Sequence, residues 1–92
     1  LLREMPSPVV ELNRAVAVAM QLGPAAGLDI IDFILSRGDL AEYQLAHSAR
    51  AELCRRLGRI DEARDSYRRA LELTRVEPEK RFIEGRMKAI SG

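Results

Sequence analysis

The stretch "LGRIDEARDSYRRALEL", from Leu57 to Leu73, decides the fold of this chain. After the glycine at its second position, small and apolar residues recur every three or four positions, which is the period of an α-helix with one buried face. That face carries Ala63, Tyr67 and Ala70. Small side chains let two helices approach closely, and an aromatic ring fills the space behind them. The stretch therefore predicts a helix packed tightly against a neighbouring helix.

Outward from this stretch, glycine, proline and capping residues divide the chain into further helices. Ser7-Pro8 suits the start of a first helix, and Gly23-Pro24 separates it from a second. Asp39 followed by Glu42 predicts a capping-box start for a third, and Glu77-Pro78 divides the last two. The predicted helices span residues 8–22, 24–36, 39–57, 60–75 and 78–90. The turns are short and no strand pattern appears, so the expected fold class is all-α, built from antiparallel helical hairpins.

Each predicted helix has one apolar stripe, which we expect to face the core. The stripes are, in chain order, Val9, Leu12, Val16, Ala19 and Met20; Leu28, Ile31, Ile34 and Leu35; Leu40, Tyr43, His47, Ala51, Cys54 and Leu57; Ile60, Ala63, Tyr67, Ala70, Leu71 and Thr74; and Phe82, Ile83, Met87 and Ile90.

The helices also repeat along the chain. A shift of 35 residues superposes the first helix on the third and pairs Val16 with Ala51, whereas a shift of 36 superposes the second on the fourth and pairs Gly27 with Ala63. This period is close to that of the tetratricopeptide repeat. The glycine, alanine, aromatic and alanine at positions 58, 63, 67 and 70 resemble that repeat's turn glycine and packing residues. We therefore expect residues 6–92 to form two tetratricopeptide-like repeats and a C-terminal capping helix.

Composition narrows the class of protein. The chain has 92 residues, of which 47% are hydrophobic and 32% charged, and its net charge is +1. No apolar run is long enough to span a membrane, so a cytoplasmic protein without membrane contact is expected. A single cysteine, Cys54, indicates a core residue rather than a nucleophile or a disulfide partner. No phosphate loop, metal-ligand spacing or paired acids appear, so neither an enzyme nor a cofactor or metal site is expected.

Charge is unevenly distributed between the two halves. Residues 1–49 carry 3 basic and 6 acidic side chains, whereas residues 50–92 carry 12 and 8. A basic second half could contact nucleic acid. However, Asp61 and Asp65 stand three or four residues before arginines on one predicted helix, at the spacing of helix-surface ion pairs. A solvated, self-paired face is the favoured interpretation.

Two sets of polar residues are candidate sites. The first helix of each such repeat lines a concave groove, which predicts a partner-binding groove that could clamp a peptide. Its predicted residues are Asn13, Arg14, Ala17, Met20, Gln21, Glu52, Arg55 and Arg56. The second set, Tyr43, His47 and Arg50, is assigned to structure: Arg50 would reach Glu11, Asp29 or Asp32, because a buried arginine needs a carboxylate. His47 would be satisfied by a backbone carbonyl or by Tyr43.

Three longer stretches carry a family resemblance. They are "PSPVVELNRAVAVAMQLGPAAGLDIID" (6–32), "LAEYQLAHSARAELCRRLGR" (40–59) and "EARDSYRRALELTRVEPEKRFIEGRM" (62–87). Together they closely resemble the C-terminal tetratricopeptide-like extension of a group of bacterial extracytoplasmic-function RNA polymerase sigma factors. The run Asn13–Ala15 and the set Tyr43, His47 and Arg50 are its specific parts. Residues 1–5, which include no initiator methionine, resemble the tail of a preceding helix or a linker, so the chain is expected to be a fragment of a longer protein.

The resemblance implies a regulatory domain. It would modulate transcription initiation by contact with the rest of its own sigma factor chain, the RNA polymerase core or a peptide ligand, while promoter DNA is bound by domains outside this chain. Two alternatives stay open: direct nucleic-acid contact by the basic half, and a structural cap that forms a homodimer. The ligand, the promoters and the sign of regulation are not determined by the sequence.

Overall fold

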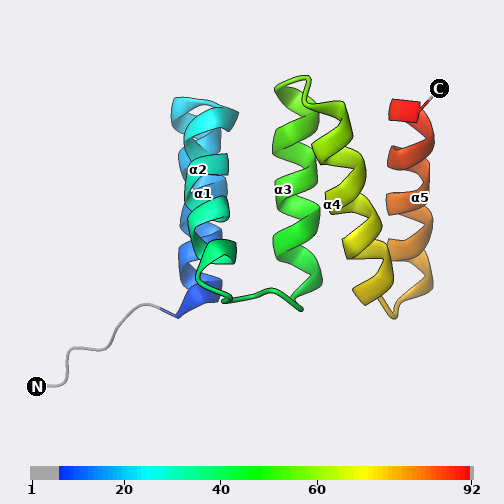
Figure 1. Cartoon of the computed structure of the whole chain (residues 1–92), viewed down its shortest axis with the longest axis horizontal. Helices are drawn as coiled ribbons and strands as arrows, with labels where there is room; N and C mark the ends of the chain where they lie inside the picture. The colour runs from blue at the N-terminus through cyan, green and yellow to red at the C-terminus, as the bar shows by residue number, and fades with distance from the viewer. Residues whose placement is uncertain (1–6, 92) are drawn as a thin grey trace, which may run out of the picture.

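The structure is a computed structural model that describes residues 7–91. It contains five α-helices: α1 (Pro8–Leu22), α2 (Pro24–Ser36), α3 (Gln44–Arg56), α4 (Ile60–Leu73) and α5 (Glu77–Ser91). Helices α3, α4 and α5 stand side by side in chain order, with the α1–α2 pair at one end (Figure 1). The predicted all-α class and its helical hairpins are confirmed, and the described residues form no strand. The prediction for residues 1–5 lies outside the described range.

Local signals at the first hairpin act as expected. The Ser7 hydroxyl accepts a hydrogen bond from the backbone N–H of Val10 at 3.2 Å, which satisfies one of the free donors at the start of α1. Gly23 ends α1 with a φ of +105°, and its N–H donates to the carbonyl of Ala19 at 3.0 Å. Because L side chains rarely adopt this backbone conformation, glycine allows α2 to begin at the next residue.

The predicted start of the third helix is wrong. Helix α3 begins at Gln44 rather than at Asp39, and residues 37–42 form turns. Gly38 and Leu40 have φ values of +87° and +59°, which no α-helix accommodates. The Asp39 carboxylate pairs with Arg37 at 2.9 Å instead of capping a helix. Leu40 in this segment and Tyr43 just after it are partly buried against the core, and this burial outweighs the local capping pattern.

The predicted stripe of α1 is also partly wrong. Val9, Val16 and Met20 are exposed, whereas Ala15 is completely buried. The reason lies in α2: a Cβ added to Gly27 would lie 2.6 Å from both the Ala15 carbonyl oxygen and the Ala19 Cβ. Helix α1 therefore rests on its two alanines, because only these short side chains allow so close an approach. Val9, Val16 and Met20 are turned out of the core, whereas Leu12 stays buried in it.

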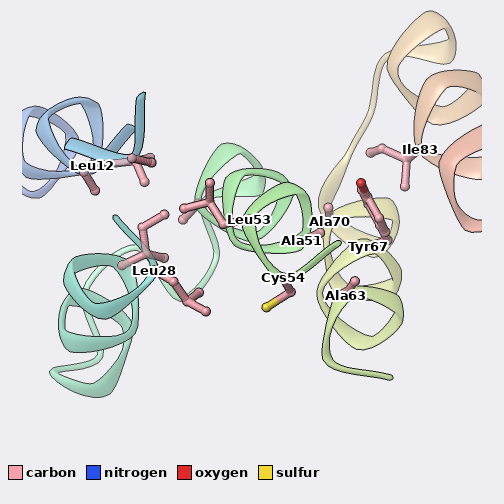
Figure 2. Packing of buried hydrophobic residues seen from close by; sticks show 13 residues of the cluster. Leu12, Leu28, Ala51, Leu53, Cys54, Ala63, Tyr67, Ala70 and Ile83 are labelled. Atoms are coloured by element: carbon pink, nitrogen blue, oxygen red, sulfur yellow. The ribbon is translucent and has the colours of Figure 1, made fainter. Parts of the chain in front are cut away.

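The core continues through all five helices. Leu53 of α3 points toward Leu12 and Leu28 of the first pair (Figure 2). On the other side, Ala63 and Ala70 of α4 are completely buried, as is the Tyr67 ring between them. The stripes predicted for α2 and α4 are largely confirmed, but α5 buries Ile83 and exposes Phe82, at 56%.

Helix starts define the repeat. Pro8 and Gln44 open α1 and α3, and Pro24 and Ile60 open α2 and α4, so both pairs are offset by 36 residues. This offset pairs Ala15 with Ala51, which are both completely buried. The predicted offset of 35 for the first helix is wrong, because it pairs the exposed Val16 with Ala51.

Candidate functional site: a groove across three helices

Three adjoining hollows form a groove over α1, α3 and α5. The first, of about 330 Å³, lies between α1 and α3, and a second, of about 290 Å³, lies between α3 and α5. They share Leu45 and Ser48. A third, of about 280 Å³, continues from the first along α1 and α3, and shares Val16, Ala49 and Glu52 with it. The hollows are therefore continuous.

Exposed apolar side chains line this groove. Met20 on α1 is 78% exposed, Leu45 on α3 49%, and Phe82 on α5 56%. Val16 and Ala49 lie between them in the hollows. Isolated exposed apolar residues are common, but an apolar series along one depression marks a surface that binds another molecule. The groove therefore presents a series of exposed apolar side chains from α1 across α3 to α5.

Glu52 is the polar centre of the groove. Its carboxylate accepts hydrogen bonds from the Tyr67 hydroxyl on α4 and, at 2.8 Å, from Nη2 of Arg55. The Arg86 Nε on α5 lies 3.2 Å from the same carboxylate. Burial acts to raise the pKa of Glu52, but the bonds from Tyr67 and Arg55 outweigh it and hold the pKa below its usual value. Burial and this carboxylate raise the pKa of Tyr67 to about 12.

The eight residues predicted for the groove divide into two groups. Asn13, Met20, Glu52 and Arg56 line the first and third hollows. Arg14, Ala17 and Gln21 are exposed on α1 but line none of these hollows, and Arg55 is bound to Glu52.

The division follows from the orientation of α1 on its alanines. Because Ala15 and Ala19 face α2, residues 14, 17 and 21 point away from α3. Sequence reasoning placed Val16 in the core and did not consider Leu45, Ala49 or Phe82 for the groove. The closely packed Gly27 is the signal that could have corrected the orientation.

Arg50 lies outside the three hollows and connects three helices. Its Nε donates to the Asp32 carboxylate on α2 at 2.6 Å, and Nη1 donates to the Ser66 hydroxyl on α4 at 2.8 Å. Burial acts to lower the pKa of Arg50, but the hydrogen bond to Asp32 and the negative charges around the guanidinium, chiefly that of Asp32, together outweigh burial and raise that pKa. A ring nitrogen of His47, Nε2, lies 2.8 Å from the carbonyl oxygen of Ala41, and Tyr43 lines the first hollow. Arg50 thus joins the first helical pair to the second.

The basic surface of α4 is largely paired within its own helix. Arg64 contacts Asp61 and Arg68 contacts Asp65, both at 3.1 Å. These are ion pairs of the predicted three-residue spacing. None of the helices in residues 7–91 is long and apolar enough to cross a membrane. The same residues contain no group of three or more His, Cys, Asp or Glu side chains that could hold a metal ion.

Comparison with known proteins gives one relative and one repeat. The chain is 42% identical over 81 residues, or 88% of its length, to an uncharacterized protein of Rhizobium meliloti, of which it spans only 19%. No solved structure matches significantly. Residues 44–75, which contain α3 and α4, match the tetratricopeptide repeat family. The second helical pair of this all-α fold is therefore a tetratricopeptide repeat, a unit that typically mediates protein–protein interaction.

Proposed function

We propose that this chain is the regulatory protein-interaction domain of a bacterial extracytoplasmic-function sigma factor, and that the groove across α1, α3 and α5 binds the regulated partner. The observation that carries the proposal is the continuous apolar series in the groove, from Met20 through Leu45 to Phe82. A partner segment would place apolar side chains in these hollows. Arg56 at one end would contact an acidic or carbonyl group of the partner.

The link to transcription has two supports. One is the resemblance of nearly the whole chain to the C-terminal extension of such sigma factors, with the set Tyr43, His47 and Arg50 among its specific parts. The other is length: the matched region is 19% of the relative, so about four-fifths of that protein lies outside it. A longer protein of this kind has room for separate polymerase-binding and promoter-binding domains. The groove would then regulate by contacting those domains or the polymerase core.

A binding experiment tests the groove. We expect Leu45→Glu and Arg56→Glu each to weaken binding to the sigma domains or core polymerase by about tenfold or more. Leu45→Glu places a charge in an apolar hollow, and Arg56→Glu reverses the charge at a contact. Arg68→Glu on α4 is the matched control, since this exposed arginine lies outside the hollows. Calorimetry gives the affinities, and circular dichroism checks the fold. Folded groove variants that bind like wild type would exclude the groove.

A transcription assay tests the regulatory role. Reconstituted polymerase is supplied with the full-length protein or with a shortened version that ends before Pro6 and so lacks this domain. Transcription from a target promoter is then measured. Loss of transcription would identify the domain as an activator, and increased transcription as an inhibitor. Unchanged transcription would contradict regulation through the sigma domains or core polymerase. Gel-shift measurements at low and high salt would separately detect nucleic-acid binding, which must fall steeply with salt.

A further inference from the structure

The side of α1 that faces away from α3 forms a second surface, distinct from the groove. We call it the end face and define it by Val10, Arg14, Ala17 and Gln21. These residues recur every three or four positions, so they lie along one side of the helix. All four are exposed. Three of them were predicted to line the groove, so the end face is where the structure places those residues instead.

The internal repeat shows what the corresponding surface does in the second pair. An offset of 36 residues pairs the four end-face positions with Ala46, Arg50, Leu53 and Leu57 of α3 and its C-terminal turn. Ala46 and Leu53 are 1% and 5% exposed, and Leu53 points toward Leu28 of α2 (Figure 2). In the second pair this side of the helix is thus buried against the helix that precedes it.

The arginine is repeated as well as the apolar positions. Arg50 on α3 meets Asp32 on the preceding helix at 2.6 Å. Arg14 occupies the equivalent position on α1, but no ion pair joins it to any residue of the range 7–91. The nearby Glu11 carboxylate is bound to Arg37 at 2.8 Å. The end face therefore carries an arginine equivalent to Arg50, but within residues 7–91 no carboxylate is bound to it, and Glu11 acts on it only through its charge.

Helix α2 also exposes a large apolar side chain. Phe33 is 60% exposed, and the Arg37 guanidinium lies over its ring at 5.1 Å from the centroid. Arg37 also binds Glu11, which precedes the end-face residue Arg14 by three positions on α1.

We infer that the end face is the docking surface for an α-helix of the same polypeptide upstream of Leu1, whose carboxylate pairs with Arg14 as Asp32 pairs with Arg50. The offset places the equivalent of α2, which spans 24–36, before the first residue of this chain. The length of the relative, of which this chain spans 19%, leaves room for such a helix. The inference rests on the proposed function only in requiring a longer chain.

Cysteine labelling tests this contact. Ala17→Cys places a thiol at the position equivalent to the buried Leu53. We expect a maleimide to label this thiol about tenfold or more slowly in the full-length protein than in the 92-residue chain. In the full-length protein the docked helix would cover the thiol, so labelling would require local opening. Ala25→Cys is the matched control. Its equivalent, Asp61, has a side chain that is 96% exposed, so this thiol should react equally fast in both proteins. Wild type gives the background from the buried Cys54.

A charge reversal tests the role of Arg14. In the full-length protein that carries Ala17→Cys, adding Arg14→Glu should restore fast labelling of the introduced thiol, whereas adding Arg14→Lys should retain most of the protection. Equal labelling rates of Ala17→Cys in the long and short proteins would overturn the inference. So would protection in the 92-residue chain that increases with its concentration, since the occupant would then be a second copy. The labelling rate does not depend on transcription. The docking of an upstream helix can therefore be disproved while the regulatory proposal holds, and the regulatory proposal can be disproved while the docking holds.

Discussion

The Tyr67 hydroxyl donates a hydrogen bond to the Glu52 carboxylate and so joins the buried packing face of α4 to the floor of the groove. The Tyr67 ring is completely buried, while the Glu52 side chain is 24% exposed. Arg55 and Arg86 contact the same carboxylate from α3 and α5. The residues that pack the tetratricopeptide repeat therefore also fix the position of the groove's central charge.

Removing this hydroxyl should destabilise the protein without changing its fold. We expect Tyr67→Phe to lower the free energy of unfolding by about 1.5–3 kcal/mol, the usual range for a hydrogen bond to a charged group. Urea denaturation followed by circular dichroism measures the change. Tyr43→Phe serves as the control, because no side-chain hydrogen bond of Tyr43 is present in the described structure. Equal stability of Tyr67→Phe and wild type would mean that water replaces the hydroxyl.

The same pair predicts how stability depends on pH. Burial and the Glu52 carboxylate raise the pKa of Tyr67 from 10.0 to about 12, so its contribution is complete below pH 10 and is lost as pH rises toward 12. The pKa of Glu52 is lowered by its hydrogen bonds despite burial, so its contribution is present above the unfolded value of 4.5 and is lost in acid. Denaturation across pH should show both losses.

Two variants separate the contributions. Tyr67→Phe should flatten the alkaline loss, and Glu52→Gln should flatten the acid loss. An alkaline profile unchanged by Tyr67→Phe would assign that loss to other groups.

The contact between Arg50 and Asp32 should couple the two helical pairs. Arg50→Met removes a partner of both Asp32 and Ser66, and we expect it to cost about 2–4 kcal/mol, since two partly buried groups lose a charged donor. Asp32→Asn should cost less, because it leaves the arginine its contacts to Ser66 and Glu62. A double-mutant cycle measures the interaction. Additive losses would show that the two side chains do not interact in solution.

The sequence predicts this fold well where one face of a helix dominates the pattern. Gly23-Pro24 and the alternation of Ala63, Tyr67 and Ala70 specify their elements locally, so the hairpins and the face of α4 were predictable. The start of α3 was not, because burial of Leu40 outweighs the Asp39 capping signal. Competition between a local capping preference and burial in the tertiary structure cannot be evaluated from the sequence of one segment alone.

The groove was half predictable for a related reason. Apolar residues occur all round α1, so several faces of that helix could enter the core. Close contact with Gly27 selects the face of Ala15 and Ala19, and this contact depends on a residue of another helix. In this orientation of α1, Val16 faces the groove and Arg14 lies on the end face.

Gly27 should therefore tolerate no larger residue. Gly27→Ala places a Cβ 2.6 Å from the Ala15 carbonyl oxygen and the Ala19 Cβ, so the two helices must separate. Overpacking of this kind costs about 1–3 kcal/mol, which exceeds or cancels the gain of up to about 1 kcal/mol that alanine provides inside a helix. Net destabilisation by thermal and urea unfolding is expected.

Gly85 of α5 provides the matched control, because nothing lies within 4 Å of a Cβ added there. Gly85→Ala should stabilise the protein by about 0.5–1 kcal/mol, since it removes only the flexibility of glycine in a helix. The difference in sign between the two substitutions measures the close approach of α1 and α2 directly. If Gly27→Ala stabilised the protein as much as Gly85→Ala, the helices would be farther apart than described, and the orientation of α1 that separates the groove from the end face would be wrong.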